Sequence, residues 1–140
     1  MAKKEIKQGK TPVGKEARSK DLLSPLKPIW SFARLDVGGP WCFSKVAQSE
    51  ITVVLSKLGH FEGMTWEELG HQKSHEVLVS QLAKQARDRL IELKQDDVDD
   101  LFSFRLEGSV RVWGIRRLNV IQVLWWDPEH KVWPYVKKHT

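Results

Sequence analysis

The chain has 140 residues, of which 41% are hydrophobic and seven are tryptophan, and its net charge is +5. This composition favours a folded protein over a disordered chain, and the length suits one domain with a single core. A single cysteine excludes an internal disulfide and a zinc-finger spacing. The longest apolar runs are too short to cross a bilayer, and no apolar segment follows the basic N-terminus as a secretory signal requires. We therefore expect a cytoplasmic protein without a membrane partner.

The positive charge is concentrated at the N-terminus. Residues 1–20 hold seven basic and two acidic side chains, whereas residues 21–140 carry 16 of each. Because residues 1–20 have almost no large apolar side chains, they are predicted to be a disordered basic tail that adds non-specific attraction to phosphate at most. Residues 21–140 are predicted to form the single domain.

Three short elements are predicted in the first half of this domain. Ile29–Asp36 alternates in polarity and predicts a strand, which Gly38 and the residues after it end. Ser44–Leu58 has apolar residues at helical spacing, which predicts a helix over this segment. Thr65 and Glu68 have the spacing of a capping box, which predicts a short helix from this point.

A long helix is predicted over Ser74–Leu93, with Ser74 as its N-cap. Its apolar stripe consists of Leu78, Leu82, Ala86, Leu90 and Leu93. The residues after it are acidic and link the helix to the last part of the chain. Asp96, Asp97, Asp99 and Asp100 could suggest a metal site, but contiguous acids in a linker are usually just solvated.

The last forty residues carry the strongest pattern in the chain. Leu101–Leu106, Val110–Arg117 and Val120–Trp126 read as three strands of an antiparallel meander. Asp127 to His130 has the form of a type I turn, and Lys131–Tyr135 is predicted to be a short edge strand. Helices gathered before an antiparallel sheet predict an α+β fold of two layers.

One face of this meander is predicted to be basic, with aromatic rings between the charges. The face comprises Arg105, Arg111, Trp113 and Arg117, joined by Gln122 and Trp126, with His130 and His139 at the ends of the sheet. Such a face can hold phosphates and stack bases. Three alternatives stay open: the arginines are only the solvated side of the sheet, the tryptophans pack rather than stack, and the histidines are ordinary polar terminal or turn residues.

The meander resembles the RelE/ParE superfamily of bacterial toxins, many of which are ribosome-dependent mRNA endonucleases, whereas ParE-type members poison gyrase. The likeness rests on a hairpin, a basic strand, an apolar strand and a basic tail: Leu106-Glu107-Gly108, then Arg111, Arg116 and Arg117, then Val120–Trp126, then Lys137, Lys138 and His139. The chain departs from the family at Gln122, where an arginine is usual.

The resemblance implies a fold with helices packed on one face of a small antiparallel sheet, in the order β-α-α-β-β-β. It implies a type II toxin that cleaves mRNA on the ribosome, is held by a cognate antitoxin protein and needs no metal or other cofactor. The expected catalytic residues are Arg111, Arg117, His130 and His139, and the expected RNA-binding residues are Arg105, Trp113, Gln122, Trp126, Lys137 and Lys138. Arginine stabilises charge that develops on phosphate, and histidine transfers protons near neutral pH. The alternatives are a non-catalytic interaction protein of a phage or mobile element, and a gyrase poison.

Overall fold

The computed structural model describes residues 26–134. The predicted basic tail and three predicted site residues, Lys137, Lys138 and His139, lie outside this range. None of the helices between residues 26 and 134 is long and apolar enough to cross a membrane.

A mixed sheet of five strands forms the centre of the molecule, in the order β2-β6-β5-β4-β3. Its strands are β2 (Ile29–Ser31), β3 (His75–Leu78), β4 (Asp100–Glu107), β5 (Val110–Arg117) and β6 (Val120–Asp127). β2 runs parallel to β6, and all other neighbours are antiparallel. The α+β class and the meander β4-β5-β6 are therefore confirmed. The first strand ends at Ser31 rather than Asp36.

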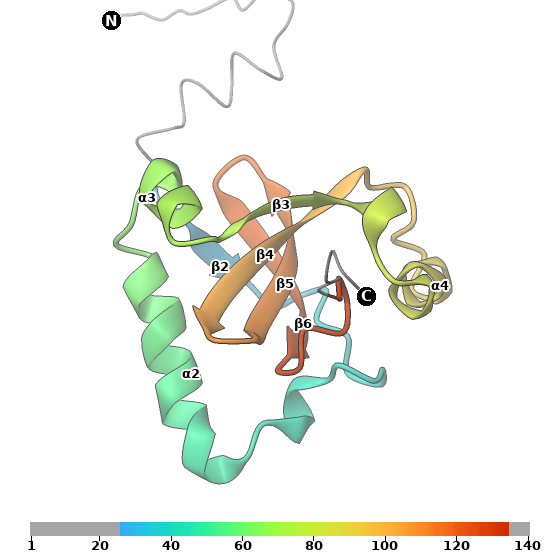
Figure 1. Ribbon diagram of the computed structural model, residues 1–140, viewed down its shortest axis with the longest axis horizontal. Coiled ribbons are helices and arrows are strands. Elements are labelled where there is room, and N and C mark those ends of the chain that lie inside the picture. Colours follow the sequence, from blue (N-terminus) through green and yellow to red (C-terminus); the bar gives the residue numbers. More distant parts are fainter. Residues whose placement is uncertain (1–25, 135–140) are drawn as a thin grey trace, which may run out of the picture.

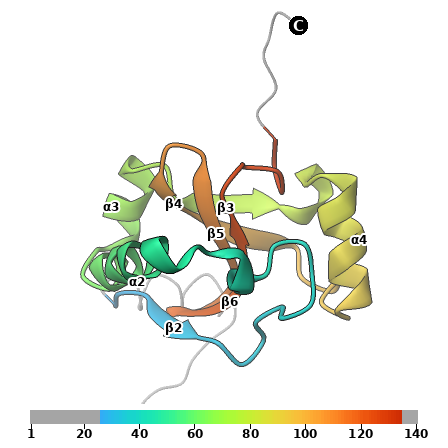
Figure 2. The same ribbon diagram turned by 90° about the horizontal axis from the view of Figure 1, so that it is seen from below.

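The helices cover both faces of the sheet, so the prediction of helices on one face is wrong. α2 (Gln48–Phe61) and α3 (Trp66–His71) lie on one side, and α4 (Lys84–Glu92) lies on the other (Figures 1 and 2). Two short 3-10 helices, Phe43–Lys45 and Val79–Gln81, complete the helical elements of residues 26–134. The physical reason is that the inner strands are apolar on both faces, so each face needs a cover.

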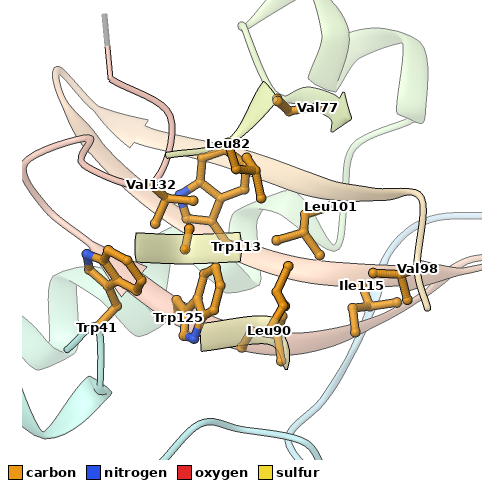
Figure 3. Packing of buried hydrophobic residues seen from close by; sticks show 12 residues of the cluster. Trp41, Val77, Leu82, Leu90, Val98, Leu101, Trp113, Ile115, Trp125 and Val132 are labelled. Carbon is orange, nitrogen blue, oxygen red and sulfur yellow. The ribbon is translucent and has the colours of Figure 1, made fainter. Parts of the chain in front are cut away.

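Two separate hydrophobic clusters result, one on each face. On the α4 face, Ala86 and Leu90 of α4 pack against Trp113, Ile115 and Trp125 of the sheet (Figure 3). On the α2/α3 face, the buried residues of the two helices meet a sheet surface rich in aromatic rings. They are Val54, Leu58, Phe61 and Leu69 from the helices, and Phe102, Phe104, Val112, Ile121, Val123 and Trp126 from the sheet.

The predicted helix Ser74–Leu93 is wrong over its first half. His75–Leu78 is instead the edge strand β3, in which Val77 pairs with Leu101 of β4. Ser74 does not cap a helix, because it is buried and its Oγ accepts a hydrogen bond from the backbone N–H of Arg105 at 2.9 Å. Pairing with β4 satisfies backbone groups that β4 would otherwise leave open, and this outweighs the local helical spacing. The described chain thus contains a strand and a helix that the predicted order β-α-α-β-β-β lacks.

Two other predictions concern the ends of helices. The helix predicted over Ser44–Leu58 begins at Gln48 and ends at Phe61. The capping box is confirmed: the N–H of Thr65 donates to Glu68 Oε1 at 2.9 Å, and the N–H of Glu68 donates to Thr65 Oγ1 at 3.1 Å.

Residues 131–134 form no strand, contrary to the prediction of an edge strand over Lys131–Tyr135. The carboxylate of Asp127 accepts hydrogen bonds from the backbone N–H of Lys131 at 2.8 Å and of Val132 at 3.0 Å. These bonds fold the chain back over the end of the sheet and leave the two N–H groups unavailable for a strand ladder.

Candidate functional site

Two arginines lie opposite each other at the hairpin end of β4 and β5. Arg105 pairs with Arg111 across the strands, so both side chains leave the same face of the sheet. Each guanidinium donates to the carbonyl oxygen of Gly108 in the hairpin turn, at 3.3 Å from Arg105 Nε and 2.6 Å from Arg111 Nη1. Because both groups reach the same oxygen, two positive charges are held side by side.

The surroundings of Arg111, including the nearby charge of Arg105, lower its pKa. Burial lowers the pKa of Arg111, the charge of Arg105 lowers it further, and the carboxylate of Asp127 opposes the shift. Asp127 itself is fully buried and already accepts from Trp113 Nε1 at 3.2 Å and from two backbone N–H groups. An anion with two acceptor oxygens would relieve the repulsion between the arginines, and phosphate has the oxygens to do so.

Two histidines flank a tryptophan beside this arginine pair. The ring centroid of Trp133 lies 5.6 Å from that of His75 and 6.1 Å from that of His130, and both contacts are edge-on. His75 stands at the start of β3 opposite Ser103 of β4, and His130 lies in the turn after β6. His130 has a φ of 60°, a left-handed conformation that non-glycine residues seldom adopt.

The two imidazoles differ in their surroundings. Burial lowers the pKa of His130 below its ordinary value of 6.5; Arg111 and His75 lower it further, and Asp127 opposes them. His130 is therefore neutral at neutral pH, and its buried Nε2 has no hydrogen-bond partner within residues 26–134. His75 Nδ1 lies 3.0 Å from the carbonyl oxygen of Glu76. Since a carbonyl oxygen only accepts, Nδ1 is the protonated nitrogen that donates in this bond, and Nε2 takes no part in it.

We name this site the arginine–histidine corner, defined by Arg105, Arg111, His75, His130 and Trp133. It unites three of the residues predicted for the site: Arg105, Arg111 and His130. His75 and Trp133 escaped prediction, because one was assigned to a helix and the other to an edge strand. The pair Val77 and Val79, β-branched residues two positions apart, was the one local signal for a strand near His75.

The predicted catalytic residue Arg117 lies elsewhere, at the far end of β5 opposite Val120. It lines a pocket of about 650 Å³ together with Arg116 and three acidic residues, Glu76, Asp99 and Asp100. Gln122 pairs with Ile115 and with Ser31 of β2, so it lies toward the opposite end of β6 from Asp127, the residue that pairs with Arg111. Neither residue belongs to the corner.

Trp113 and Trp126 are not available to stack on bases, so this part of the prediction is wrong. Trp113 is fully buried in the cluster under α4, and Trp126 is 7% exposed in the cluster under α2 and α3. Strand alternation predicted both tryptophans on the face of the arginines, but Trp126 pairs with Val112 and lies on the opposite face after a register shift between β5 and β6. Helices from other parts of the chain cover both faces.

Within the described part of the chain, no group of three or more histidine, cysteine or acidic side chains is placed to hold a metal ion. The chain matches no protein-family model, and no curated protein or solved structure is significantly similar to it.

Proposed function

We propose that this chain is an RNA-binding endoribonuclease of the RelE-like type, the toxin of a toxin–antitoxin pair, and that the arginine–histidine corner holds the phosphate that is cleaved. The observation that carries the proposal is the pair of guanidinium groups on the Gly108 carbonyl, next to an imidazole that is neutral at neutral pH. Phosphate binding needs the first feature, and proton removal needs the second.

The chemistry assigns a role to each group. Arg105 and Arg111 bind the oxygens of one phosphate and stabilise the negative charge that develops on it. Neutral His130 takes the proton of the neighbouring 2′-hydroxyl, whose oxygen then attacks the phosphorus. The bond to the 5′-oxygen breaks, leaving a 2′,3′-cyclic phosphate, and His75 gives a proton to the departing oxygen. Because Nε2 of His130 is buried, this nitrogen has to become exposed as RNA enters.

Part of the family's order of elements supports the RelE-like assignment. A first strand, two helices and a terminal three-stranded meander are present as β2, α2, α3 and β4-β5-β6. β3 and α4 stand between the second helix and the meander as additions to that order. The proposed substrate is mRNA on the ribosome, and the proposed partner is a cognate antitoxin protein.

The test is controlled expression in a bacterial host, with growth and mRNA cleavage as readouts. Wild type should arrest growth and produce RNA ends with 2′,3′-cyclic phosphates. Arg111→Ala should lower cleavage by about 100-fold or more, the scale on which removing one group that stabilises transition-state charge acts. Arg117→Ala is the matched control, since it removes an arginine from the other end of the same strand, and it should stay active.

Different outcomes separate the alternatives. If wild type neither arrests growth nor cleaves mRNA, the nuclease proposal fails. If purified protein binds single-stranded RNA through Arg111 without cleaving it, the chain is a non-catalytic interaction protein. Equal loss of cleavage in Arg111→Ala and Arg117→Ala would contradict the location of the site.

A further inference from the structure

Helix α2 runs past the hairpin that joins β4 to β5 (Figure 1). A small apolar groove lies between them. Its volume is about 200 Å³. Val53 and Val54 of α2 form one wall, Leu106 and Val110 form the other, and Trp126 of β6 lies between them. Nothing in the arginine–histidine corner uses this groove.

Two features of the groove are unusual for a surface that only meets water. Val53 is 56% exposed at its rim, although the neighbouring Val54 is buried in the core. The indole N–H of Trp126 is buried and has no hydrogen-bond acceptor within residues 26–134. Buried polar groups in folded proteins normally have a hydrogen-bond partner. A ligand bound in the groove can supply the acceptor that the Trp126 N–H lacks.

The charges at the rim indicate what kind of occupant fits. Glu50 and Glu107 contribute two carboxylates and Lys57 one ammonium, so the rim is negative overall in a chain whose net charge is +5. The volume accommodates one large apolar side chain rather than a whole helix or a drug-sized ligand. Anchoring of this kind, with one side chain in a pocket and polar contacts around it, is how protein partners concentrate their binding energy.

We propose that the groove is a docking site for a peptide segment of a partner protein, with an apolar anchor residue and a basic residue close to it. The anchor enters between Val53 and Val110, and the basic side chain pairs with Glu50 or Glu107. A backbone carbonyl of the segment accepts from Trp126 Nε1. Since that nitrogen is buried, the side chains that cover it have to shift before the bond forms.

The groove and the arginine–histidine corner lie on opposite faces of the same hairpin. Leu106 faces the cluster under α2 and α3, with Val110 packed against it, whereas Arg105 and Arg111 leave the other face. A peptide in the groove therefore leaves the arginines open, and both ligands can be bound at once. The inference does not depend on RNA cleavage.

The experiment is selection from a library of displayed random peptides against the full chain, followed by fluorescence polarisation with the selected peptides. Selected sequences should share an apolar residue next to lysine or arginine. Val53→Arg, which places a long charged side chain across the groove, should weaken peptide binding by about tenfold or more. Leu55→Arg is the matched control, because Leu55 is on the same helix and equally exposed at 56% but does not line the groove.

Reversing the charge of one rim residue gives a second, independent test of peptide binding. Glu107→Lys should weaken the same peptides and favour peptides with an acidic neighbour. The proposal is overturned if no peptide is enriched over a blank surface, or if Val53→Arg binds the selected peptides as well as wild type does. Equal weakening by Leu55→Arg would also overturn it, because binding would then belong to the exposed side of α2.

Discussion

The two faces of the sheet treat their buried tryptophans differently. On the α4 face, two buried indole N–H groups donate to buried carboxylates: Trp125 to Asp36 at 2.9 Å, and Trp113 to Asp127 at 3.2 Å. Asp36 is held further by Arg89, whose Nε and Nη2 donate to its two oxygens at 2.8 and 2.7 Å. This face is therefore apolar in its centre but fixed by specific hydrogen bonds.

The α2/α3 face is built mainly from aromatic contacts, and its one indole hydrogen bond among the described residues goes to a backbone carbonyl, from Trp30 Nε1 to Leu58 at 2.9 Å. Phe102 and Phe104 lie 4.5 Å apart between ring centroids, and Trp66 and Trp30 meet them edge-on. The indole N–H groups of Trp66 and Trp126 are buried without an acceptor among the described residues. Hydrogen bonds to buried carboxylates hold the side chains of the α4 face in place, which suits the chemistry proposed for its edge. The α2/α3 face instead has an indole N–H without an acceptor and the groove proposed as a docking site.

Breaking the buried ion pair should have the largest effect on stability. Asp36→Ala leaves Arg89 and Trp125 without their common acceptor, and we expect a loss of about 3–5 kcal/mol in the free energy of unfolding. Urea denaturation measures it. Lys84→Ala is the control, since it removes only the exposed Lys84–Asp88 pair and should change stability by less than about 0.5 kcal/mol. A small effect of Asp36→Ala would mean that the α4 face is not fixed by this network.

A matched pair of substitutions compares the two faces directly. Trp113→Phe removes a donor from the buried carboxylate of Asp127 and should cost about 2–3 kcal/mol. Trp126→Phe loses similar volume but no hydrogen bond, and should cost about 1 kcal/mol. Thermal or urea unfolding of both variants tests the difference. Equal costs would show that the hydrogen bond on the α4 face contributes nothing.

The stability that Asp36 contributes to the α4 face should depend on pH. The hydrogen bond from Arg89 lowers the pKa of Asp36 below its ordinary 3.8, against the opposing effect of burial, and the bond from Trp125 lowers it further. A lowered pKa contributes stability above the unfolded-state value and loses it as pH falls through the folded-state value. The stability gap between wild type and Asp36→Asn should therefore shrink from about pH 6 to about pH 3. A gap that is constant with pH would contradict this linkage.

The smallest effect is expected at the edge of the α2/α3 face. Arg116 lies over the ring of Trp66, with its guanidinium carbon 3.7 Å from the ring centroid. Arg116→Ala should cost about 0.5–1 kcal/mol, the size of a cation–π contact near the surface. Arg116→Lys should recover part of it. A loss above about 2 kcal/mol would indicate that Arg116 also holds the acidic residues of the neighbouring pocket.

The sequence by itself determined the local features of this protein. Strand alternation and turn residues predicted β4, β5 and β6, with ends within one residue of those observed for each predicted segment. The Thr65–Glu68 capping box was readable because its two hydrogen bonds join residues three positions apart. Alternation also placed Arg105 and Arg111 on one face, which is the part of the corner that follows from strand geometry alone.

Tertiary structure decided everything that depends on contacts between distant segments. His75–Leu78 has helical spacing, yet it forms β3 because the edge of β4 offers backbone hydrogen bonds that no local pattern reports. Alternation predicted the face of Trp113, but a register shift between β5 and β6 places Trp126 on the opposite face. The helices that bury the two tryptophans come from other parts of the chain. The corner needs β3, the hairpin and the turn after β6 together, so its histidines and Trp133 could meet the arginines only once the strand order was set.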